Sequence, residues 1–445
     1  MIINSLFGNI RKNEIKTTVI IAGQEVAMKA NTNPAKGMRD ITPQEKEIRD
    51  YVEGVIVNTY KQSGFELIET PVVENIENLV GSKGGENLKL IFKILKRGEK
   101  LDFSKGELSE EDLADLGLRY DLTVPLSRFY CNNKANLPAV FKALQVGNVF
   151  RAERAQKGRY RSFKQCDIDI IGDGTKAAEL ELIATTAKAL NALGVNDFVV
   201  RFNDRRVLKA VITSCGFTEA EFDSVCIVVD KLDKIGMEGI QKELREKQYN
   251  DEAITKLVDA LKSMNEKGTE SLSEYGVSED VVKEVKEILE SSRRYAGDKY
   301  DVEFDFTLIR GMGYYTGSIF EVAYKDLGYS IAGGGRYDEM VGNFIGEKIP
   351  AIGFSIGFER LVNQLMEEKF RVPGQEKVVM LYESGDDYID VMKKADELRE
   401  QGYVVSLFEK AKKLSKQLNQ FTEYGFNKFA VYGGEETELK DLSAN

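Results

Sequence analysis

Residues 150–172 read FRAERAQKGRYRSFKQCDIDIIG, two β-rich runs joined by a strongly basic turn. Six cations lie between residues 151 and 164 of this stretch, and Glu153 is the only carboxylate in that interval. The cations are Arg151, Arg154, Lys157, Arg159, Arg161 and Lys164. A run of charges is usually a solvated surface, but this excess of positive charge favours an anion-binding site. The segment therefore predicts a β-hairpin whose connecting loop binds anions.

Further segments rich in glycine and arginine lie on both sides of this hairpin. GFELIETPVV at 64–73 places Pro71 inside a β-rich run, which suits a sheet edge or an interface. Downstream are LIRGMGYYTGSIFEV at 308–322, AGGGRYD at 332–338 and AIGFSIGFERL at 351–361. Guanidinium groups bind phosphate and carboxylate bidentately, and arginines on interior strands are costly without anionic partners. These arginines therefore favour ligand binding.

The composition excludes several kinds of chemistry. The 445 residues include no histidine, which rules out an imidazole base, a histidine-ligated metal and a Ser-His-Asp triad. Four cysteines without CxxC spacing indicate reduced thiols and neither a disulfide framework nor a zinc knuckle. The net charge of −11 argues against general nucleic-acid affinity, so a polynucleotide would need a local basic surface. No apolar run is long enough to span a membrane and no signal-peptide layout is present, so we expect a cytoplasmic protein.

The length predicts two or three domains. We expect an N-terminal extension at 1–32, an α+β domain at 33–372 with a helical insertion at about 206–298, and a parallel α/β domain at 376–445. A helix is expected at 41–63 because a Thr-Pro pair and an acidic first turn open it. Strands of a mainly antiparallel sheet are expected at 65–73, 90–95, 117–121, 144–151, 162–171, 198–202, 302–309, 318–324 and 329–333.

Together the quoted segments resemble those of class II aminoacyl-tRNA synthetases, and in particular of histidyl-tRNA synthetases. The resemblance covers motif 1 at 64–73, motif 2 at 150–172, motif 3 at 351–361, and the histidine-specific segments LRYDLTVP at 118–125 and 308–322. It implies an antiparallel catalytic sheet flanked by helices and a C-terminal α/β domain that binds the anticodon. It also implies a histidine–tRNA ligase that uses ATP with Mg²⁺ and charges tRNA(His), without zinc, haem or flavin.

The resemblance assigns one set of residues to ATP. Arg151 is expected to contact the α-phosphate and the carboxylate of histidine. Glu153 matches the residue that meets the adenine amino group, and Phe163 the one that stacks on its ring. The outer phosphates and the adenine face are assigned to Arg159 or Arg161, together with Arg360. Arg310 and Arg151 are expected to be the catalytic residues.

A second set is assigned to histidine and to tRNA. Asp121, Thr123 and Gln165 match the site of the α-ammonium group, and Arg151 and Arg310 also belong to the histidine site. Asp169, Tyr314 and Tyr315 match the imidazole pocket, although adjacent strand residues face opposite sides and one tyrosine could instead be a core residue. The acceptor end of tRNA is expected to touch Gln156, Lys157 and Gly158.

The sequence departs from the family pattern in two places, and it leaves two alternative functions open. Met312 and Gly313 stand where the family signature usually reads Leu-Asp, and the C-terminal domain is expected to be shorter than usual. One alternative is a non-catalytic paralogue that regulates ATP phosphoribosyltransferase in histidine biosynthesis, but such paralogues lose the activation arginines kept here. The other is a synthetase for a different amino acid. A homodimer through residues 65–73 is expected in the synthetase.

Overall fold

The protein is described here by a computed structural model. It describes residues 15–21, 24–81, 89–101, 108–154, 159–309, 313–325, 327–374, 376–433 and 437–442. The first two elements, β1 (Ile15–Ile21) and β2 (Gln24–Ala30), pair antiparallel. Among the described residues, no helix combines the length and apolar character needed to cross a membrane.

The largest sheet of the described chain has eight strands. In spatial order they are β10 (Asp301–Phe304), β9 (Phe198–Asp204), β11 (Ser318–Tyr324), β12 (Ser330–Arg336), β13 (Ala351–Gly357), β8 (Ser162–Ile171), β7 (Phe141–Phe150) and β3 (Glu66–Leu67). Neighbours run antiparallel except at the two edges, where β10 is parallel to β9 and β3 is parallel to β7. The α+β fold with an antiparallel-rich sheet is thus confirmed, with these two parallel edges as a refinement.

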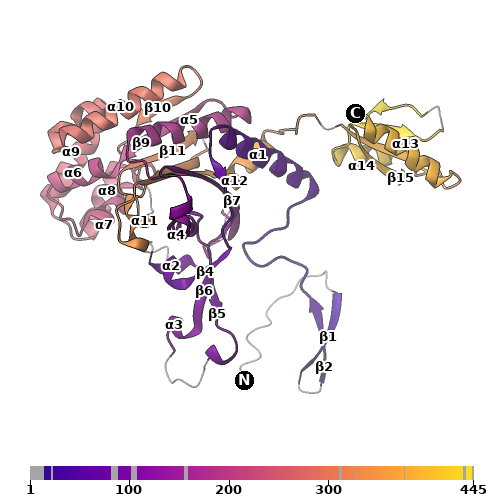
Figure 1. The fold of residues 1–445 in the computed structure, drawn as a ribbon, viewed down its shortest axis with the longest axis horizontal. Helices are drawn as coiled ribbons and strands as arrows, with labels where there is room; N and C mark the ends of the chain where they lie inside the picture. The colour runs from indigo at the N-terminus through magenta and orange to yellow at the C-terminus, as the bar shows by residue number, and fades with distance from the viewer. Residues whose placement is uncertain are drawn as a thin grey trace.

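Helices cover the sheet. The helix expected at 41–63 is α1 (Pro43–Gln62), where Thr42 caps the N-terminus and Pro43 occupies the first turn. It packs against α5 (Lys176–Ala192) and α12 (Phe358–Glu367), and Figure 1 shows α1 and α5 along one side of the sheet. Elsewhere α4 (Thr123–Asn133), followed by a 3₁₀ turn at Lys134–Asn136, packs against α11 (Asp338–Ile345).

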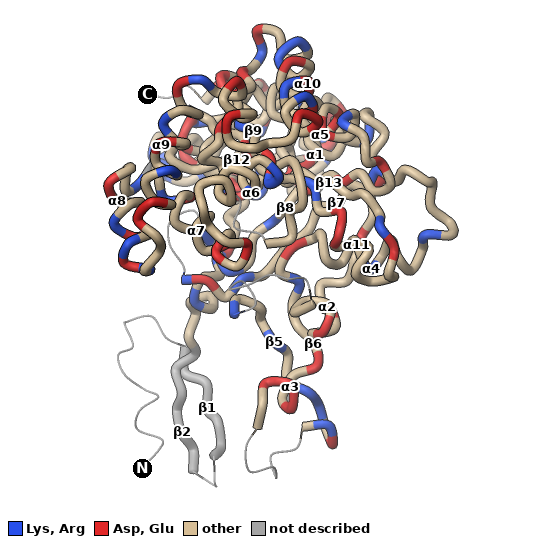
Figure 2. The backbone as a smooth tube through the Cα atoms, turned by 90° about the vertical axis from the view of Figure 1, so that its left-hand side faces the viewer, with Lys and Arg blue, Asp and Glu red and all other residues tan. Residues whose placement is uncertain are grey.

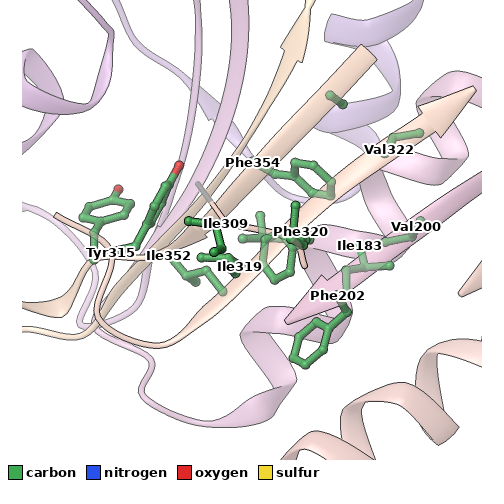
Figure 3. Packing of buried hydrophobic residues seen from close by; sticks show 14 of the residues in the cluster. Ile183, Val200, Phe202, Ile309, Tyr315, Ile319, Phe320, Val322, Ile352 and Phe354 are labelled. Atoms are coloured by element: carbon green, nitrogen blue, oxygen red, sulfur yellow. The ribbon is translucent and has the colours of Figure 1, made fainter. Parts of the chain in front are cut away.

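A row of aromatic side chains fills the core beside the central strands. Phe320 lies between Phe202 and Phe354, with ring centroids 6.2 and 5.0 Å away. In Figure 3 this row continues through Ile319 and Ile352 toward Tyr315. Because packed interiors deform little, the row supplies a rigid base for the segment that carries Tyr315.

Residues predicted to form a helical insertion are helical. They form α6 (Arg205–Ser214), α7 (Phe222–Val229), α8 (Leu232–Glu246), α9 (Asp251–Lys267), a 3₁₀ segment (Gly268–Tyr275) and α10 (Glu279–Ala296). α10 packs on α5 and on β10, which places these helices against one end of the sheet (Figure 1).

The C-terminal residues form a second sheet with its own apolar core. It contains β14 (Lys377–Tyr382), β15 (Val404–Glu409), β16 (Lys428–Val431) and β17 (Lys440–Asp441), with α13 (Tyr388–Glu400) and α14 (Leu414–Glu423) between the strands. The order is β15-β14-β16-β17, and only the added β17 is antiparallel. Figure 1 shows this part standing apart from the main body.

A small three-stranded sheet projects from the body on the side away from α1 (Figures 1 and 2). Its strands are β4 (Val73–Asn75), β6 (Ala114–Leu118) and β5 (Lys93–Leu95), accompanied by α2 (Ile76–Val80), a 3₁₀ turn (Gly98–Lys100) and α3 (Glu110–Leu113). Pro71 separates β3 from β4, so the run 65–73 is divided between two sheets.

Several predicted strands have the wrong ends: β6 begins at Ala114, β5 covers only Lys93–Leu95 of the expected 90–95, and β7 begins at Phe141 and not at 144. The strand expected at 117–121 is β6, which ends at Leu118, because the Asp121 carboxylate accepts the backbone N–H of Val124 at 3.0 Å and starts α4. The strand expected at 302–309 ends at Phe304. Beyond it the carboxylate of Asp305 accepts the N–H of Thr307 at 2.9 Å, which turns the chain.

Candidate active site

Two cavities share part of their lining at the centre of the large sheet. The smaller has a volume of about 100 Å³ and the larger about 560 Å³. Arg151, Gln165, Gly333 and Ser355 line both. The larger volume is usual for a drug- or nucleotide-sized ligand, whereas the smaller is several times the volume that one ordered water needs. The pair fits a large ligand placed beside a small one.

Alternate residues of β8 form the floor of the smaller cavity. Side chains two positions apart share one face of a strand, and Gln165, Asp167 and Asp169 all line it. Glycine is required on the neighbouring strands: a Cβ on Gly353 would lie 2.0 Å from Oδ1 of Asp169, and one on Gly334 would lie 2.0 Å from the Gly353 carbonyl oxygen. The glycines of AGGGRYD therefore let the strands approach and leave the cavity open.

A buried hydrogen bond fixes Asp169. The hydroxyl of Tyr337 donates to its Oδ1 at 2.6 Å, and both side chains are buried. Burial raises the pKa of Asp169 to about 7; Asp121 adds to this shift and the Tyr337 hydrogen bond opposes it. Burial, and then the charge of Asp169, raises the pKa of Asp167 well above its usual value. The floor therefore holds carboxyl groups that retain protons more readily than free ones.

Three buried acceptors on this floor lack a hydrogen-bond partner within the described structure. They are Oε1 of Gln165, Oδ1 of Asp167 and Oδ2 of Asp169. The Gln165 amide nitrogen is already engaged, because it donates to Oγ of Ser355 at 3.1 Å. Buried acceptors are normally paired, so the cavity is suited to a ligand that brings N–H groups.

Asp121 and Thr123 line the same cavity from the start of α4. Asp121 is buried, and burial raises its pKa, although the backbone N–H of Val124 opposes the shift. Asp121 thus adds a further carboxyl group to the cavity beside those of β8, which suits an ammonium group.

Arg151 stands where the two cavities meet. Its Nε donates to the Tyr120 carbonyl oxygen at 3.2 Å. The guanidinium also lies over two rings, 4.2 Å from the centroid of Tyr120 and 5.0 Å from that of Phe163. Stacking of this kind holds the group in place and leaves its outer N–H groups directed to a ligand. It can therefore reach an anion in either cavity.

Most of the residues assigned to ATP line the larger cavity. These are Arg151, Glu153, Arg159, Phe163 and Arg360. Arg360 is anchored, since its Nη1 donates to the Ser330 carbonyl oxygen at 2.6 Å. Between the alternatives Arg159 and Arg161, only Arg159 is among the described residues that line this cavity.

Arg161 is used elsewhere. Its Nε donates to the Glu153 carbonyl oxygen at 2.9 Å, and its backbone N–H donates to the Gly37 carbonyl oxygen at 2.8 Å. A Cβ on Gly37 would lie 2.7 Å from the Arg161 side chain, so the glycine is needed for this contact. Arg161 thus joins the basic hairpin to the segment before α1.

Both members of the tyrosine pair line the smaller cavity. Tyr314 and Tyr315 lie in a turn before β11 and not within a strand, so the strict alternation of a strand does not separate them. Their rings meet edge to face at 4.9 Å. Thr316 anchors the turn by donating its N–H to the Arg336 carbonyl oxygen at 2.8 Å. Arg310 and the residues assigned to the tRNA acceptor end, Gln156, Lys157 and Gly158, lie outside the described residues.

A largely buried ion-pair network adjoins the larger cavity, which Glu359 lines. Arg49 on α1 forms two contacts with Glu359 on α12, at 2.6 and 2.7 Å, and Arg39 reaches the same carboxylate at 3.0 Å. Although burial opposes it, Arg49 holds the pKa of Glu359 below its usual value. Arg39 also lies 4.5 Å from the centroid of Tyr160, a residue that lines the larger cavity.

Sequence reasoning missed three polar side chains of the smaller cavity: Asp167, Tyr337 and Ser355. Asp167 could have been found, because it falls between Gln165 and Asp169 in the same alternation. Tyr337 and Ser355 had no such local signal; only the pairing of β8 with β13 and the end of β12 brings them to the site.

Comparison with known proteins places this arrangement in a family. The family model described as "Histidyl-tRNA synthetase" matches residues 37–361. The histidine–tRNA ligase of Leifsonia xyli subsp. xyli is 42% identical over 415 residues, which cover 91% of this chain and 96% of that one. This chain belongs to the histidyl-tRNA synthetase family. The probable histidine–tRNA ligase of Tropheryma whipplei (strain Twist) is 38% identical over 89% of this chain and 94% of its own.

Solved structures agree with this membership. The histidyl-tRNA synthetase from Nostoc sp. PCC 7120 has a TM-score of 0.74 and 28% identity, covering 93% of this chain and 95% of that one. A Bacillus halodurans protein described as an ATP phosphoribosyltransferase regulatory subunit/histidyl-tRNA synthetase has a TM-score of 0.69 at 23% identity, over 87% of this chain and 96% of its own. That second likeness shows a shared fold alone.

Proposed function

We propose that this member of the histidyl-tRNA synthetase family activates L-histidine with ATP and transfers it to tRNA(His). The observation that carries the proposal is the meeting of two cavities at Arg151: one is small and rich in acceptors, and the other is large and lined by arginines. The names of the relatives point the same way.

In the first step, a carboxylate oxygen of histidine attacks the α-phosphorus of ATP. The new O–P bond forms as the bond to the β-phosphate oxygen breaks, and pyrophosphate leaves. Arg151 is placed to hold the two reacting anions together and to stabilise the charge that develops on the α-phosphate. We assign the same role to Arg310. No proton has to be removed by a histidine base, in keeping with a chain that contains no histidine.

In the second step, a ribose hydroxyl of the tRNA terminus attacks the carbonyl carbon of histidyl-adenylate, AMP leaves with the bonding electron pair, and the hydroxyl proton passes to the departing phosphate. We assign the approach of the acceptor end to Gln156, Lys157 and Gly158. The C-terminal unit at 376–445 is proposed to bind the anticodon, and 33–372 to be the catalytic unit with its insertion at 206–298.

Histidine recognition divides between two groups of residues. Asp121, Thr123 and Gln165 are assigned to the α-ammonium group, and Asp169 with Tyr314 and Tyr315 to the imidazole. A site that hydrogen-bonds the ring rejects apolar analogues, because its buried acceptors would then stay unpaired. The unpaired Oδ2 of Asp169 supports this assignment.

ATP is assigned to the larger cavity, with Phe163 and Arg360 on its two ring faces, Arg159 at the outer phosphates and Glu153 at the adenine amino group. Mg²⁺ arrives with ATP as part of the substrate and neutralises phosphate charge. Among the described residues no cluster of three or more acidic or cysteine side chains could hold a metal by itself. Glu321 also lines this cavity and offers the oxygen ligands that Mg²⁺ prefers.

We further propose a cytoplasmic homodimer. Leu67 on β3, Val72 between the strands and Val73 on β4 are 48%, 39% and 41% exposed, an unusual amount of apolar surface for one short run that includes the edge of the large sheet. The β3 edge of the eight-stranded sheet pairs only with β7 in the described chain.

ATP–pyrophosphate exchange with each of the twenty amino acids tests the function. Exchange that depends on histidine alone supports the proposal. Exchange with another amino acid would make the chain a different synthetase. Absence of exchange, combined with stimulation of ATP phosphoribosyltransferase, would favour the regulatory paralogue.

A further inference from the structure

The structure contains a third cavity that the mechanism above does not use. Its volume is about 570 Å³, close to that of the larger cavity. Its lining comes mainly from α2, α6, α7, α11 and the turn before β11. Among the described residues, Tyr314 and Tyr315 are the only ones that line both this third cavity and the smaller cavity. A wall of two tyrosine side chains therefore separates a space of about 100 Å³ from a much larger one.

The two tyrosines are held in this wall to different degrees. Tyr315 belongs to the core, because it is buried and ends the row of apolar side chains in Figure 3. A Cβ on Gly335 would lie 2.8 Å from its ring, so β12 packs directly on it. Tyr314 is half-buried, and its ring meets those of Tyr315 and Tyr337 edge to face at 4.9 and 6.3 Å. Tyr314 is therefore the part of the wall that can be truncated with less loss of core packing.

Beyond the wall, the third cavity has apolar surface of its own. Phe222 on α7, and Met340 and Phe344 on α11, line it together with the two tyrosines. A cavity of this volume with a partly aromatic lining is typical of small-molecule sites. The space behind Tyr314 is therefore large enough for a substituent of the size of a phenyl ring.

The charges around the third cavity are balanced or hydrated. Each of the three cations on α6 that line it has a carboxylate partner. The pairs are Arg205 with Asp223, Arg206 with Asp204, and Lys209 with Glu219. Glu77 and Glu339 also line the cavity, and both are exposed to solvent. Because a further charge would enter this space without a dedicated partner, a neutral apolar group suits it best.

From these observations we infer that Tyr314 sets the upper size of the amino acid that the smaller cavity accepts. The inference rests on the proposed function, which places the imidazole of histidine against the two tyrosines. Tyr314 is a specificity-determining residue that acts by exclusion, since an open space and not solid protein lies behind its ring. With that ring removed, the third cavity takes an apolar group attached to the ring of histidine.

The substrate class follows from the hydrogen bonds assigned to the ring. An alkyl group on a ring nitrogen would replace the N–H that Asp169 is assigned to accept. A group on a ring carbon leaves both nitrogens as they are in histidine. The class is therefore L-histidine with an uncharged alkyl or aryl group on a ring carbon, and 2-benzyl- and 5-benzyl-L-histidine are suitable probes.

The experiment compares these probes in ATP–pyrophosphate exchange. The wild type should activate histidine and neither benzylhistidine. In Tyr314→Ala, kcat/KM for at least one benzylhistidine should rise about 10-fold or more above the wild type, because apolar contacts in a pocket change kcat/KM by about 10- to 200-fold. For histidine itself kcat/KM should fall, since the ring loses a contact. A role of Tyr314 in folding alone predicts a loss for every substrate and a gain for none.

Two further variants locate the gain. Tyr295→Ala removes a tyrosine ring that is 64% exposed on α10, and it should behave as the wild type with all three amino acids. Asn343 is an exposed residue of α11 that lines the third cavity. Adding Asn343→Trp to Tyr314→Ala should fill that space and remove the gained activity. If the gain persists beside the new tryptophan, the benzyl group does not occupy the third cavity and the inference is wrong.

The remaining outcomes separate this inference from the proposed function. Activation of a benzylhistidine by the wild type would overturn the inference, and so would a folded Tyr314→Ala that uses histidine but gains neither probe. Either result leaves the proposed function intact. Absence of histidine-dependent exchange in the wild type would overturn the proposed function instead. Tyr314→Val replaces the alanine variant if that one does not fold, and titration calorimetry detects binding of a probe that is not activated.

Discussion

The buried hydroxyl of Tyr337 donates a hydrogen bond of 2.6 Å to Oδ1 of Asp169, a residue 168 positions earlier in the chain. The bond holds one carboxylate oxygen and directs the other, which is unpaired, toward the cavity. The position of Asp169 is therefore set by the fold before any substrate arrives, which limits the reorganisation needed on binding.

Asp169→Ala should raise the KM for histidine about 10- to 100-fold and leave the KM for ATP nearly unchanged, because hydrogen bonds to charged groups contribute about 1.5–3 kcal/mol. ATP–pyrophosphate exchange measures both constants. Asp301→Ala is the control on an exposed strand. An equal loss for the two substrates would indicate a structural role for Asp169.

The pH dependence of stability should report the same carboxyl group. Its pKa is about 7 in the folded protein against about 3.9 in an unfolded chain, so the folded state binds more protons between these values. Stability therefore falls as the pH rises from about 4 to 7. Without ligand, Asp169→Asn should lose less thermal stability between pH 5.5 and 8 than the wild type. A parallel loss in both proteins would count against the raised pKa.

Arg310→Ala should reduce adenylate formation about 100-fold without unfolding the protein, since removing one group that stabilises transition-state charge typically costs about 3 kcal/mol. Exchange rates measure the loss of adenylate formation, and circular dichroism shows whether the variant is folded. Arg371→Ala provides an exposed control. Activity within a few-fold of the wild type would remove Arg310 from the catalytic residues.

Lys157→Ala should weaken aminoacylation of tRNA and reduce its salt dependence, while exchange remains unaffected. Loss of one phosphate contact lowers the slope of log K against log salt by about 0.7 to 0.9. Lys188→Ala, exposed on α5, is the matched control. An unchanged slope would place the acceptor end at another surface.

A dimer should be observed by light scattering at micromolar concentration. Val73→Asp should convert it to monomer, because a carboxylate would be buried in an apolar interface. Tyr295→Asp, at a side chain that is 64% exposed on α10, should leave the dimer intact. A wild-type monomer would rule out the proposed interface.

Local signals located much of the fold. The strands predicted at 162–171 and 318–324 coincide with β8 and β11, because each combines an apolar alternation with turn residues at its ends. The prediction failed at 305–309, where Asn203 donates to the carbonyl oxygens of Phe306 and Leu308 at 3.0 Å and holds a turn. That contact comes from about a hundred residues away and leaves no periodic signal.

In the site, too, local signals could be predicted from the sequence and contacts between distant residues could not. Residues inside a recognisable motif could be assigned from the chain, and the structure brings Asp121, Arg151, Gln165, Asp169, Tyr314 and Tyr315 around one cavity. The choice between Arg159 and Arg161 required the partners of Arg161 at Gly37 and Glu153. Which groups a side chain contacts depends on the three-dimensional fold. The spacing of residues in the sequence therefore could not decide between Arg159 and Arg161.

The pairing of Arg49 with Glu359 has a consequence for how the protein is made. The two residues are 310 positions apart, so α1 leaves the ribosome long before its partner exists. Until then Glu45 is the carboxylate partner of Arg39 and Arg49, at 2.5 and 3.4 Å, and β8 lacks its neighbour β13. Contacts of such long sequence separation fold slowly and leave intermediates exposed. The large sheet is therefore completed only after β13 (Ala351–Gly357) has been translated, and until then its unpaired strand edges are exposed to aggregation.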